Sequence, residues 1–194
     1  MLGVILCGGK SLRMGNDKGL LFHQDELWAQ VAYDKLRLVG LPVKLSVNAA
    51  QQEDYAKHFG FDQLIVDAPS LAIKGPLLGL LSAHSLFPEE DLFLLACDLL
   101  AMEFQLLEKL LHEYASEGSF DAYIFNKGGQ QEPICGIYTA QGQKKIMQKL
   151  KTTGLEKHSM KYILRNLQVF EIKLEGKDEK AFTNFNSHAD LNGL

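Results

Sequence analysis

The stretch VILCGGKSLRMGNDKGLL, from Val4 to Leu21, joins a short apolar run to two adjacent glycines and a polar segment that carries Lys10, Arg13 and Lys18. Four to five apolar residues that stop at glycine are typical of a buried β-strand. Backbone N–H groups after such a strand, together with cationic side chains, form a cradle for an anion. We therefore predict a buried strand that runs into an anion-binding loop.

The glycines of this stretch do not fit two familiar phosphate-loop patterns. The first glycine of a Walker A motif would fall on Val4, and the Rossmann motif does not place its glycines side by side as Gly8 and Gly9 are. Two simpler interpretations stay open. The glycines could only free the backbone between a strand and a helix, and Asp17 could pair locally with Lys18 for under ~1 kcal/mol. The number of cations in so short a stretch favours anion binding.

The composition is that of an ordinary globular protein. The 194 residues are 46% hydrophobic and 23% charged, with a formal net charge of −4. This length suits a single domain, residues 1–194, that can bury roughly 70% of its unfolded surface. Because there is no general positive charge, we expect neither nucleic acid nor a membrane surface as a partner.

The cysteines and the first residues favour a cytoplasmic location. The three cysteines are odd in number and form no C-x-x-C pair, which argues for reduced thiols and against a disulfide framework or a zinc cage. The first apolar run lacks a basic leader and meets glycines at once, unlike a signal peptide. No stretch approaches the ~20 apolar residues of a membrane-spanning helix.

Short apolar runs alternate with helical patterns along the first half of the chain. Strands are predicted at residues 3–7, 42–48, 63–67 and 91–98, and helices at 25–40, 52–60, 76–87 and 103–118. The less regular second half has predicted strands at 120–126, 133–139 and 168–174, helices at 141–154 and 159–167, and a last helix capped by Ser187. The pattern predicts an α/β fold of three layers, Rossmann-like, with a mostly parallel central sheet and helices on both faces.

Polar residues and glycines directly follow several of the predicted strands. Ligands of open α/β sheets bind beyond the carboxyl ends of the strands. That rule selects Gly8-Gly9, Asn48, Asp67 and Asp98 as site candidates.

The segment LCGGKSLRMGNDKGLL, residues 6–21, resembles the nucleotidyltransferase signature L-x-G-G-x-S-x-R-M-G-x-D-K-x-L, and is most similar to that of the molybdenum cofactor guanylyltransferase (MobA) family. The segments SVNAAQQEDY, IVDAP, GPLLGLLSA, LLACDL, QEPICGIY and NFNSHADL resemble later motifs of this family in the same order, so the resemblance covers most of the chain. It implies the nucleotidyltransferase fold and an enzyme that transfers GMP from GTP to the terminal phosphate of molybdopterin. Pyrophosphate is released, and Mg²⁺ is required.

The resemblance also implies roles for single residues. The positions that would bind the nucleotide are Leu6, Cys7, Gly8, Gly9, Lys18, Asn48, Asp67 and Asp98. Among them, Asn48 and Asp67 would contact the guanosine. Arg13 and Lys18 would face the triphosphate and act in catalysis with Asp98, the expected Mg²⁺ ligand.

The chemistry of these residue types agrees with the implied roles. A carboxylate at the end of a buried strand, as at Asp98, is costly unless it is paired or metal-bound, and Mg²⁺ prefers one or two carboxylates plus phosphate oxygens. Asp67 could accept hydrogen bonds from the adjacent N–H groups of guanine, although it could instead cap a helix. The cytidylyl relatives commonly have Leu-Ala-Ala-Gly at the first loop. The extra glycine at Gly8 gives room for guanine, so GTP is favoured over CTP.

Two departures from the family pattern concern the expected metal site. The family usually has Pro-Cys-Asp-x-Pro around its metal aspartate, whereas residues 96–100 here are Ala-Cys-Asp-Leu-Leu, so the loop after Asp98 lacks the restraint of proline. Near the end of the chain, the family often has Val between two asparagines, whereas this chain has Asn184-Phe185-Asn186. By resemblance to related nucleotidyltransferase folds, Asn186 could help to hold the metal, or it could only form a turn before Ser187. Cys7 and Cys97 flank the expected site, but without a histidine nearby in sequence we expect no thiol catalysis.

Other functions stay open beside the guanylyl transfer. One is a molybdopterin cytidylyltransferase, or another nucleotidyltransferase that acts on a phosphorylated acceptor; the other is a nucleotide-binding module without catalysis. The presence of Arg13, Lys18 and Asp98 together favours an enzyme. The implied partners are GTP and molybdopterin or Mo-molybdopterin, with transient contact to a molybdenum-insertion protein or to enzymes that receive the cofactor. By analogy alone, residues 127–131 and Pro133 would hold the pterin.

Overall fold

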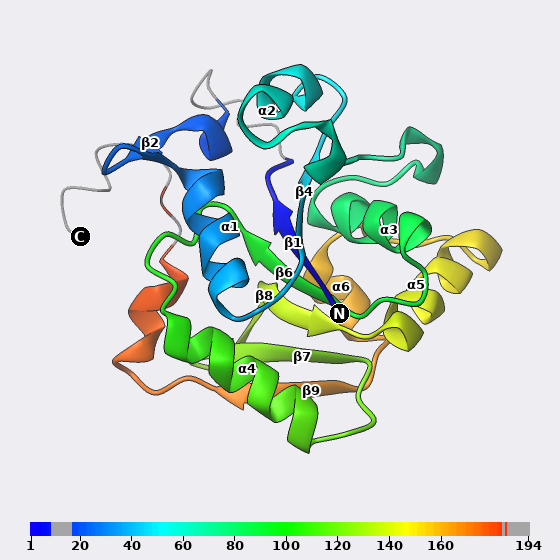
Figure 1. Ribbon diagram of the computed structural model, residues 1–194. Coiled ribbons are helices and arrows are strands. Elements are labelled where there is room, and N and C mark those ends of the chain that lie inside the picture. Colours follow the sequence, from blue (N-terminus) through cyan, green and yellow to red (C-terminus); the bar gives the residue numbers. More distant parts are fainter. Residues whose placement is uncertain (9–16, 184, 186–194) are drawn as a thin grey trace.

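Seven strands form the central sheet in the order β5-β4-β1-β6-β8-β7-β9 (Figure 1). The computed structural model describes residues 1–8, 17–183 and 185. The strands are β1 (Leu2–Leu6), β4 (Val43–Val47), β5 (Leu64–Val66), β6 (Leu92–Ala96), β7 (Ala122–Lys127), β8 (Gln130–Tyr138) and β9 (Val169–Lys173). Within the described residues, β8 alone is antiparallel to its neighbours β6 and β7, and the other neighbouring pairs are parallel. The prediction of a mostly parallel sheet is confirmed.

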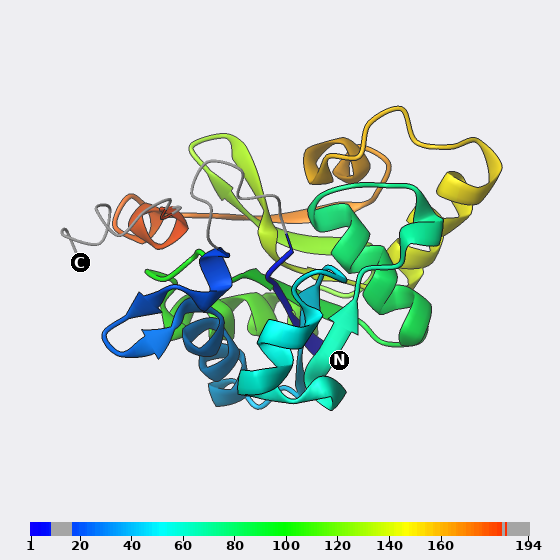
Figure 2. The same ribbon diagram turned by 90° about the horizontal axis from the view of Figure 1, so that it is seen from above.

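Helices cover both faces of this sheet, which gives three layers (Figure 2). The helices are α1 (Trp28–Leu38), α2 (Gln52–Phe59), α3 (Pro76–Leu86), α4 (Phe104–Ser116), α5 (Ala140–Thr152) and α6 (Met160–Leu164). Side chains of β1 alternate between the two faces. Ile5 packs in one core with residues of α1 and α4, and Val4 packs in the other core with residues of α3, α5 and α6. Because both faces are covered, β1 is apolar throughout.

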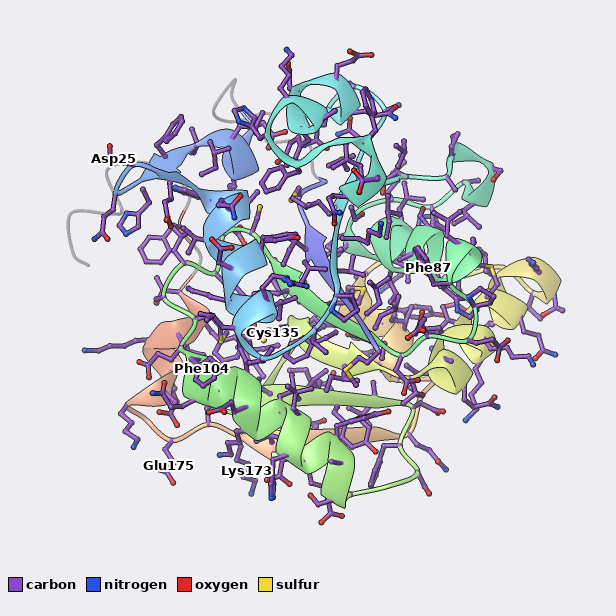
Figure 3. The ribbon with its side chains drawn as sticks, in the orientation of Figure 1. Asp25, Phe87, Phe104, Cys135, Lys173 and Glu175 are labelled. Atoms are coloured by element: carbon purple, nitrogen blue, oxygen red, sulfur yellow. The ribbon has the colours of Figure 1, made fainter. Side chains whose placement is uncertain are left out.

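Short elements complete the described chain and correct three predicted boundaries. They are η1 (Lys18–Leu20), η2 (Phe61–Gln63), η3 (Pro69–Leu71), η4 (Asp178–Phe182) and the hairpin β2 (Phe22–His23) to β3 (Glu26–Leu27). The helix predicted from residue 25 begins at Trp28, because Asp25 has a positive φ of 66° at the tip of the β2–β3 hairpin (Figure 3). β8 begins at residue 130 rather than 133, since Gly128 and Gly129 both have positive φ and allow a two-residue turn. The helix predicted at 159–167 is shorter, and the one predicted after Ser187 lies outside the described residues.

The parallel strands β1, β4, β5 and β6 end at one edge of the sheet, which we call the carboxyl edge. Gly8, Asn48, Asp67 and Asp98 follow these strands within two residues, so the predicted site candidates lie at the same edge. No helix in the described ranges is long and apolar enough to cross a membrane.

Candidate active site

A pocket of about 200 Å³ opens at the carboxyl edge, between the ends of β1 and β6. Its lining residues are Leu6, Cys7, Gly8, Asp17, Lys18, Pro76, Ala96, Cys97, Asp98 and Ile134. Segments that are far apart in sequence therefore meet here: the end of β1, the start of η1, the first turn of α3, the end of β6 and one residue of β8. Of the residues predicted to bind nucleotide, Leu6, Cys7, Gly8, Lys18 and Asp98 lie in this pocket.

A cation and a carboxylate meet at the pocket wall. Lys18 Nζ donates a hydrogen bond to Asp98 Oδ2 at 3.1 Å, across 80 residues of sequence. The two side chains are 22% and 19% exposed, so both are reachable from solvent. Ion pairs near a surface contribute about 1 kcal/mol or less. A phosphate group and its counter-ion can therefore compete for both partners.

The loop that carries Asp98 is held without the prolines of the family pattern. Leu99 and Leu100 are buried, and the Leu99 N–H donates to the Ala96 carbonyl at 3.2 Å. The Lys35 ammonium, on α1, donates to the carbonyl oxygen of Leu100. Burial and hydrogen bonds thus supply the restraint that proline gives elsewhere.

Lys35 is an unusual residue because its ammonium lies within the layer between α1 and the sheet. Burial lowers the pKa of Lys35 to about 8, and the nearby thiol of Cys135 acts weakly in the opposite direction. Figure 3 shows Cys135 at the level of α1, on the central part of the sheet. The loop beyond Asp98 is therefore tied to a lysine whose charge changes near neutral pH.

Asp67 follows β5 and lies next to Gly8, which follows β1, with β4 between the two strands. A Cβ built on Gly8 would lie 3.4 Å from Asp67 Oδ2, so the carboxylate lies beside a residue that lines the pocket. Ser46 Oγ lies 3.3 Å from Asp67 Oδ1. Burial raises the pKa of Asp67 to about 6, and the hydrogen bond from Ser46 offsets part of that shift.

Asn48 is engaged in a turn at the start of α2. Its Oδ1 accepts from the N–H groups of Ala50 at 2.9 Å and Gln51 at 3.1 Å. The predicted contact of Asn48 with guanosine would therefore use other atoms of the side chain, and it stays a prediction.

Asp17 has a larger role than the local ion pair considered from the sequence. Its carboxylate accepts from the Gly19 N–H at 3.0 Å and from the Tyr55 hydroxyl at 2.8 Å. The side-chain amide of Gln51 donates to its second oxygen. Gln51 and Tyr55 escaped the sequence analysis. The spacing of Asn48 and Gln51, which is that of a capping box, was the available signal for Gln51.

Comparisons with known proteins identify the family of the chain. The model of the MobA-like NTP transferase domain matches residues 3–169. The chain belongs to the MobA-like NTP transferase family. It is 29% identical over 98% of its length to a probable molybdenum cofactor guanylyltransferase of Flavobacterium johnsoniae, 94% of which is covered. It is 31% identical over 96% of its length to a molybdenum cofactor guanylyltransferase of Campylobacter jejuni, 91% of which is covered.

Solved structures show the same fold. The structure of molybdopterin-guanine dinucleotide biosynthesis protein A from Archaeoglobus fulgidus matches with a TM-score of 0.79 at 19% identity, and the match covers 100% of this chain and 96% of that one. A CMP-2-keto-3-deoxy-manno-octonic acid synthetase matches with a TM-score of 0.72 at 14% identity, covering 99% of this chain and 95% of the synthetase. The predicted nucleotidyltransferase fold is confirmed.

The acidic residues of this MobA-like site suit a metal ion that is bound jointly by the protein and by the phosphates of a substrate. In the ranges that the structure describes, no three His, Cys, Asp or Glu side chains gather as a metal cage. Asp98 supplies one partly exposed carboxylate to the pocket. Mg²⁺ in phosphate-transfer sites is bound by one or two carboxylates together with substrate phosphates. The residues present therefore fit Mg²⁺.

The other residues named in the sequence analysis of this MobA-like chain fall into two groups. Gly9, Arg13, Asn184 and Asn186 fall outside the described residues. On the β7–β8 hairpin, Lys127 donates to the Glu179 carbonyl at 2.9 Å and the Gln131 amide to Glu171 at 2.6 Å, so both suggested pterin contacts have partners within the protein.

The two thiols of the pocket are arranged for packing rather than for attack. Cys7 and Cys97 are buried and free. A hydrogen bond with Cys7, and then burial, raises the pKa of the Cys97 thiol. A nucleophilic cysteine needs a lowered pKa, so the raised pKa of Cys97 is the opposite of what thiol catalysis requires.

Proposed function

We propose that the protein transfers GMP from GTP to the phosphate of molybdopterin, forming a guanine dinucleotide and pyrophosphate. The observation that carries the proposal is the pocket in which the Gly8 backbone, Lys18 and Asp98 come together at the ends of β1 and β6. Relatives named as guanylyltransferases, aligned over nearly the whole chain, support the choice of reaction.

The reaction is an in-line displacement at the α-phosphorus of GTP. An oxygen of the acceptor phosphate forms the new P–O bond while the bond to the bridging oxygen breaks, and pyrophosphate leaves with the electron pair. Such a reaction needs positioning and charge neutralisation rather than a protein nucleophile. Lys18 and Arg13 stabilise the departing pyrophosphate, and Asp98 would hold Mg²⁺. When bound, Mg²⁺ supplies neutralisation of the phosphate charges.

The choice of nucleotide rests on Asp67. A carboxylate can accept two hydrogen bonds from the adjacent N–H groups of guanine, whereas cytosine and adenine lack that pair of donors. Asp67 borders Gly8 and has one weak hydrogen bond within the protein, at 3.3 Å from Ser46. It is therefore able to bind a base.

The cellular setting follows from the chemistry of the chain. Three free, buried thiols fit the reducing cytoplasm. The net charge of −4 fits a small-molecule enzyme that binds neither nucleic acid nor membranes. Since the dinucleotide must be passed on, transient contact with a molybdenum-insertion protein or with cofactor-receiving enzymes belongs to the proposal.

A nucleotide panel tests the function. The protein is incubated with molybdopterin, Mg²⁺ and GTP, CTP, ATP or UTP, and the dinucleotide and pyrophosphate are identified by mass and by a phosphate assay. We expect product with GTP. Product with CTP alone would identify a cytidylyltransferase, and binding of GTP without turnover would identify a nucleotide-binding module; either result contradicts the proposal.

A further inference from the structure

We propose that Asp17 is a positioning residue, held by Gln51 and Tyr55, which fixes Lys18 in the pocket and so controls both GTP binding and transfer. The proposal rests on the function proposed above, and it assigns the task of aligning Lys18 to side chains that are hydrogen-bonded to one another. We call Asp17, Gly19, Gln51 and Tyr55 the brace.

The carboxylate of Asp17 is held from three sides. Oδ1 accepts from the Gly19 N–H at 3.0 Å and from the Tyr55 hydroxyl at 2.8 Å, and Oδ2 accepts from the Gln51 amide. A carboxylate whose oxygens accept such bonds is satisfied within the protein. Asp17 therefore lines the pocket with most of its acceptor sites engaged within the protein.

The amide of Gln51 is itself fixed in orientation. The Asn48 N–H donates to Gln51 Oε1 at 2.8 Å, and the Gln51 N–H donates back to Asn48 Oδ1 at 3.1 Å. This is the reciprocal pattern of a capping box. With the oxygen engaged, Nε2 faces the site and donates to the Cys7 carbonyl at 3.1 Å as well as to Asp17. Gln51 thus joins the end of β1 to the segment that carries Lys18.

Tyr55 reaches Asp17 through a space that only glycine leaves open. The tyrosine is 0% exposed, on α2. A Cβ built on Gly19 would lie 2.1 Å from its hydroxyl oxygen, so any larger residue at Gly19 would displace the ring. Burial, and then nearby Cys7, Cys97 and Asp17, raise the pKa of Tyr55, so the hydroxyl stays protonated and donates.

The brace acts on Lys18 through the backbone. Asp17 caps η1, and Lys18 is the first residue of that turn. Its long, flexible side chain has many rotamers, so a fixed backbone limits where the ammonium can reach. In the structure it reaches Asp98 at 3.1 Å, within the pocket. A shift of about 1 Å in such a group can lower a rate by about 10²-fold.

A double-mutant cycle tests this assignment. Tyr55→Phe removes the hydroxyl alone, and we expect kcat/KM for GTP to fall about tenfold, with KM raised and kcat lowered as for Lys18→Ala. In the Lys18→Ala background the same change should have little further effect, because the brace acts through Lys18. Tyr114→Phe is the matched control: it also removes a tyrosine-to-aspartate hydrogen bond, to Asp91, at the opposite edge of the sheet. We expect it to leave kcat/KM unchanged.

One further measurement and one further variant complete the test. Amide hydrogen exchange of residues 17–21 should accelerate in Tyr55→Phe and stay slow in Tyr114→Phe. Gln51→Ala serves as the second variant should Tyr55→Phe fold poorly. Equal losses of kcat/KM in the wild-type and Lys18→Ala backgrounds would overturn the proposal, as would unchanged kinetics with unchanged exchange.

Failure of the proposed function would look different. The wild-type protein would then transfer no GMP, while the GTP dissociation constant could still be measured by titration. If Tyr55→Phe weakens GTP binding only when Lys18 is present, the brace is supported without the reaction; if it weakens binding equally without Lys18, the brace is refuted.

Discussion

Aspartates at the two edges of the central sheet have different surroundings. At the amino edge, Asp91 accepts from the Tyr114 hydroxyl and from the Ala140 N–H, the latter at 2.6 Å. Asp121 is 4% exposed and binds Lys145 Nζ through both oxygens, at 2.7 and 2.8 Å. These carboxylates have strong partners from distant elements, and they hold α4 and α5 against the sheet.

At the carboxyl edge, Asp98 and Asp67 are less completely satisfied by the described residues. Asp98 has its ion pair with Lys18 at 3.1 Å, and Asp67 lies 3.3 Å from the Ser46 hydroxyl. Asp98 lines the pocket, and Asp67 lies beside its lining residue Gly8. The same residue type thus stabilises the fold at one edge and stays available to a ligand at the other, so equivalent substitutions should separate stability from function.

We expect the largest difference in the rate of GMP transfer between the variants Asp98→Asn and Asp91→Asn. Loss of the charge expected to hold Mg²⁺ should lower the single-turnover rate of GMP transfer by at least ~10²-fold, while GTP affinity stays close to wild type. Asp91→Asn should lower the melting temperature and leave the rate unchanged. Single-turnover kinetics and GTP titrations, with and without Mg²⁺, measure both. Transfer by Asp98→Asn at the wild-type rate would place the metal elsewhere.

A comparison of Lys18→Ala with Lys145→Ala should distinguish the two edges of the sheet in a second way, since one variant should lose activity and the other stability. Lys18 faces phosphates that are charged in the ground state and more so as pyrophosphate leaves, so both GTP affinity and rate should fall, by about 10–100-fold in kcat/KM. Lys145→Ala leaves the buried Asp121 without its cation and should reduce stability alone. Steady-state kinetics beside thermal melts decide this. A stable Lys18→Ala protein with normal kcat/KM would contradict the pocket assignment.

Asp67→Asn should weaken guanine selection and stabilise the protein. The pKa of Asp67 in the folded protein, about 6, lies above the usual aspartate value of 3.8. Ionisation of the carboxyl therefore lowers the stability of the folded protein as pH rises through 6. Below about pH 4 this loss is absent, because the carboxyl is then neutral in the folded protein. Above pH 6 the neutral amide of Asp67→Asn should raise the free energy of unfolding by about 1 kcal/mol. Because the side chain is partly exposed, this gain is smaller than a shift of two pKa units would give.

The preference for GTP over ATP and CTP tests the functional part of this prediction. The preference should fall about tenfold in Asp67→Asn, and in the wild-type protein it should decline below pH 6. Titrations and melts at pH 5 and pH 7.5 cover both effects. An unchanged preference at both pH values would remove Asp67 from base recognition.

The last effect concerns stability alone and comes from Lys35, between the two edges. Its pKa in the folded protein is about 8, below the usual lysine value of 10.5, so the unfolded chain binds more protons between these values. Wild-type stability should therefore rise with pH in this window, by up to about 3 kcal/mol. Lys35→Met should abolish this part of the slope. Urea unfolding at pH 7.5 and 9.5 measures the difference, and equal slopes in the two proteins would show that Lys35 is solvated.

Much of this arrangement could be predicted because its signals are local. The apolar run before Gly8-Gly9 predicted β1, and Gly75-Pro76 predicted the start of α3. The order of the elements then predicted the edge at which Asp67 and Asp98 gather. These signals lie within a few residues of the feature that they specify.

The contacts that sequence reasoning missed join residues far apart in the chain. Asp17 meets Tyr55 across 38 residues, and Lys35 meets Leu100 across 65. Such pairs leave no periodic pattern, because neither partner constrains the neighbours of the other. The β2–β3 hairpin was missed for a different reason: its turn uses Asp25 at positive φ, where glycine is the usual indication.

The central position of β1 has a consequence for synthesis of the protein. β1 pairs on one side with β4 and on the other with β6, which ends at Ala96. At ribosomal rates the residues between β1 and the end of β6 take roughly 5–20 s to appear. During this time the apolar segment LGVIL lacks at least one neighbour, and its open backbone can pair with another nascent chain. The strand that leads into the pocket is therefore a segment that benefits from protection by chaperones until β6 has been synthesised.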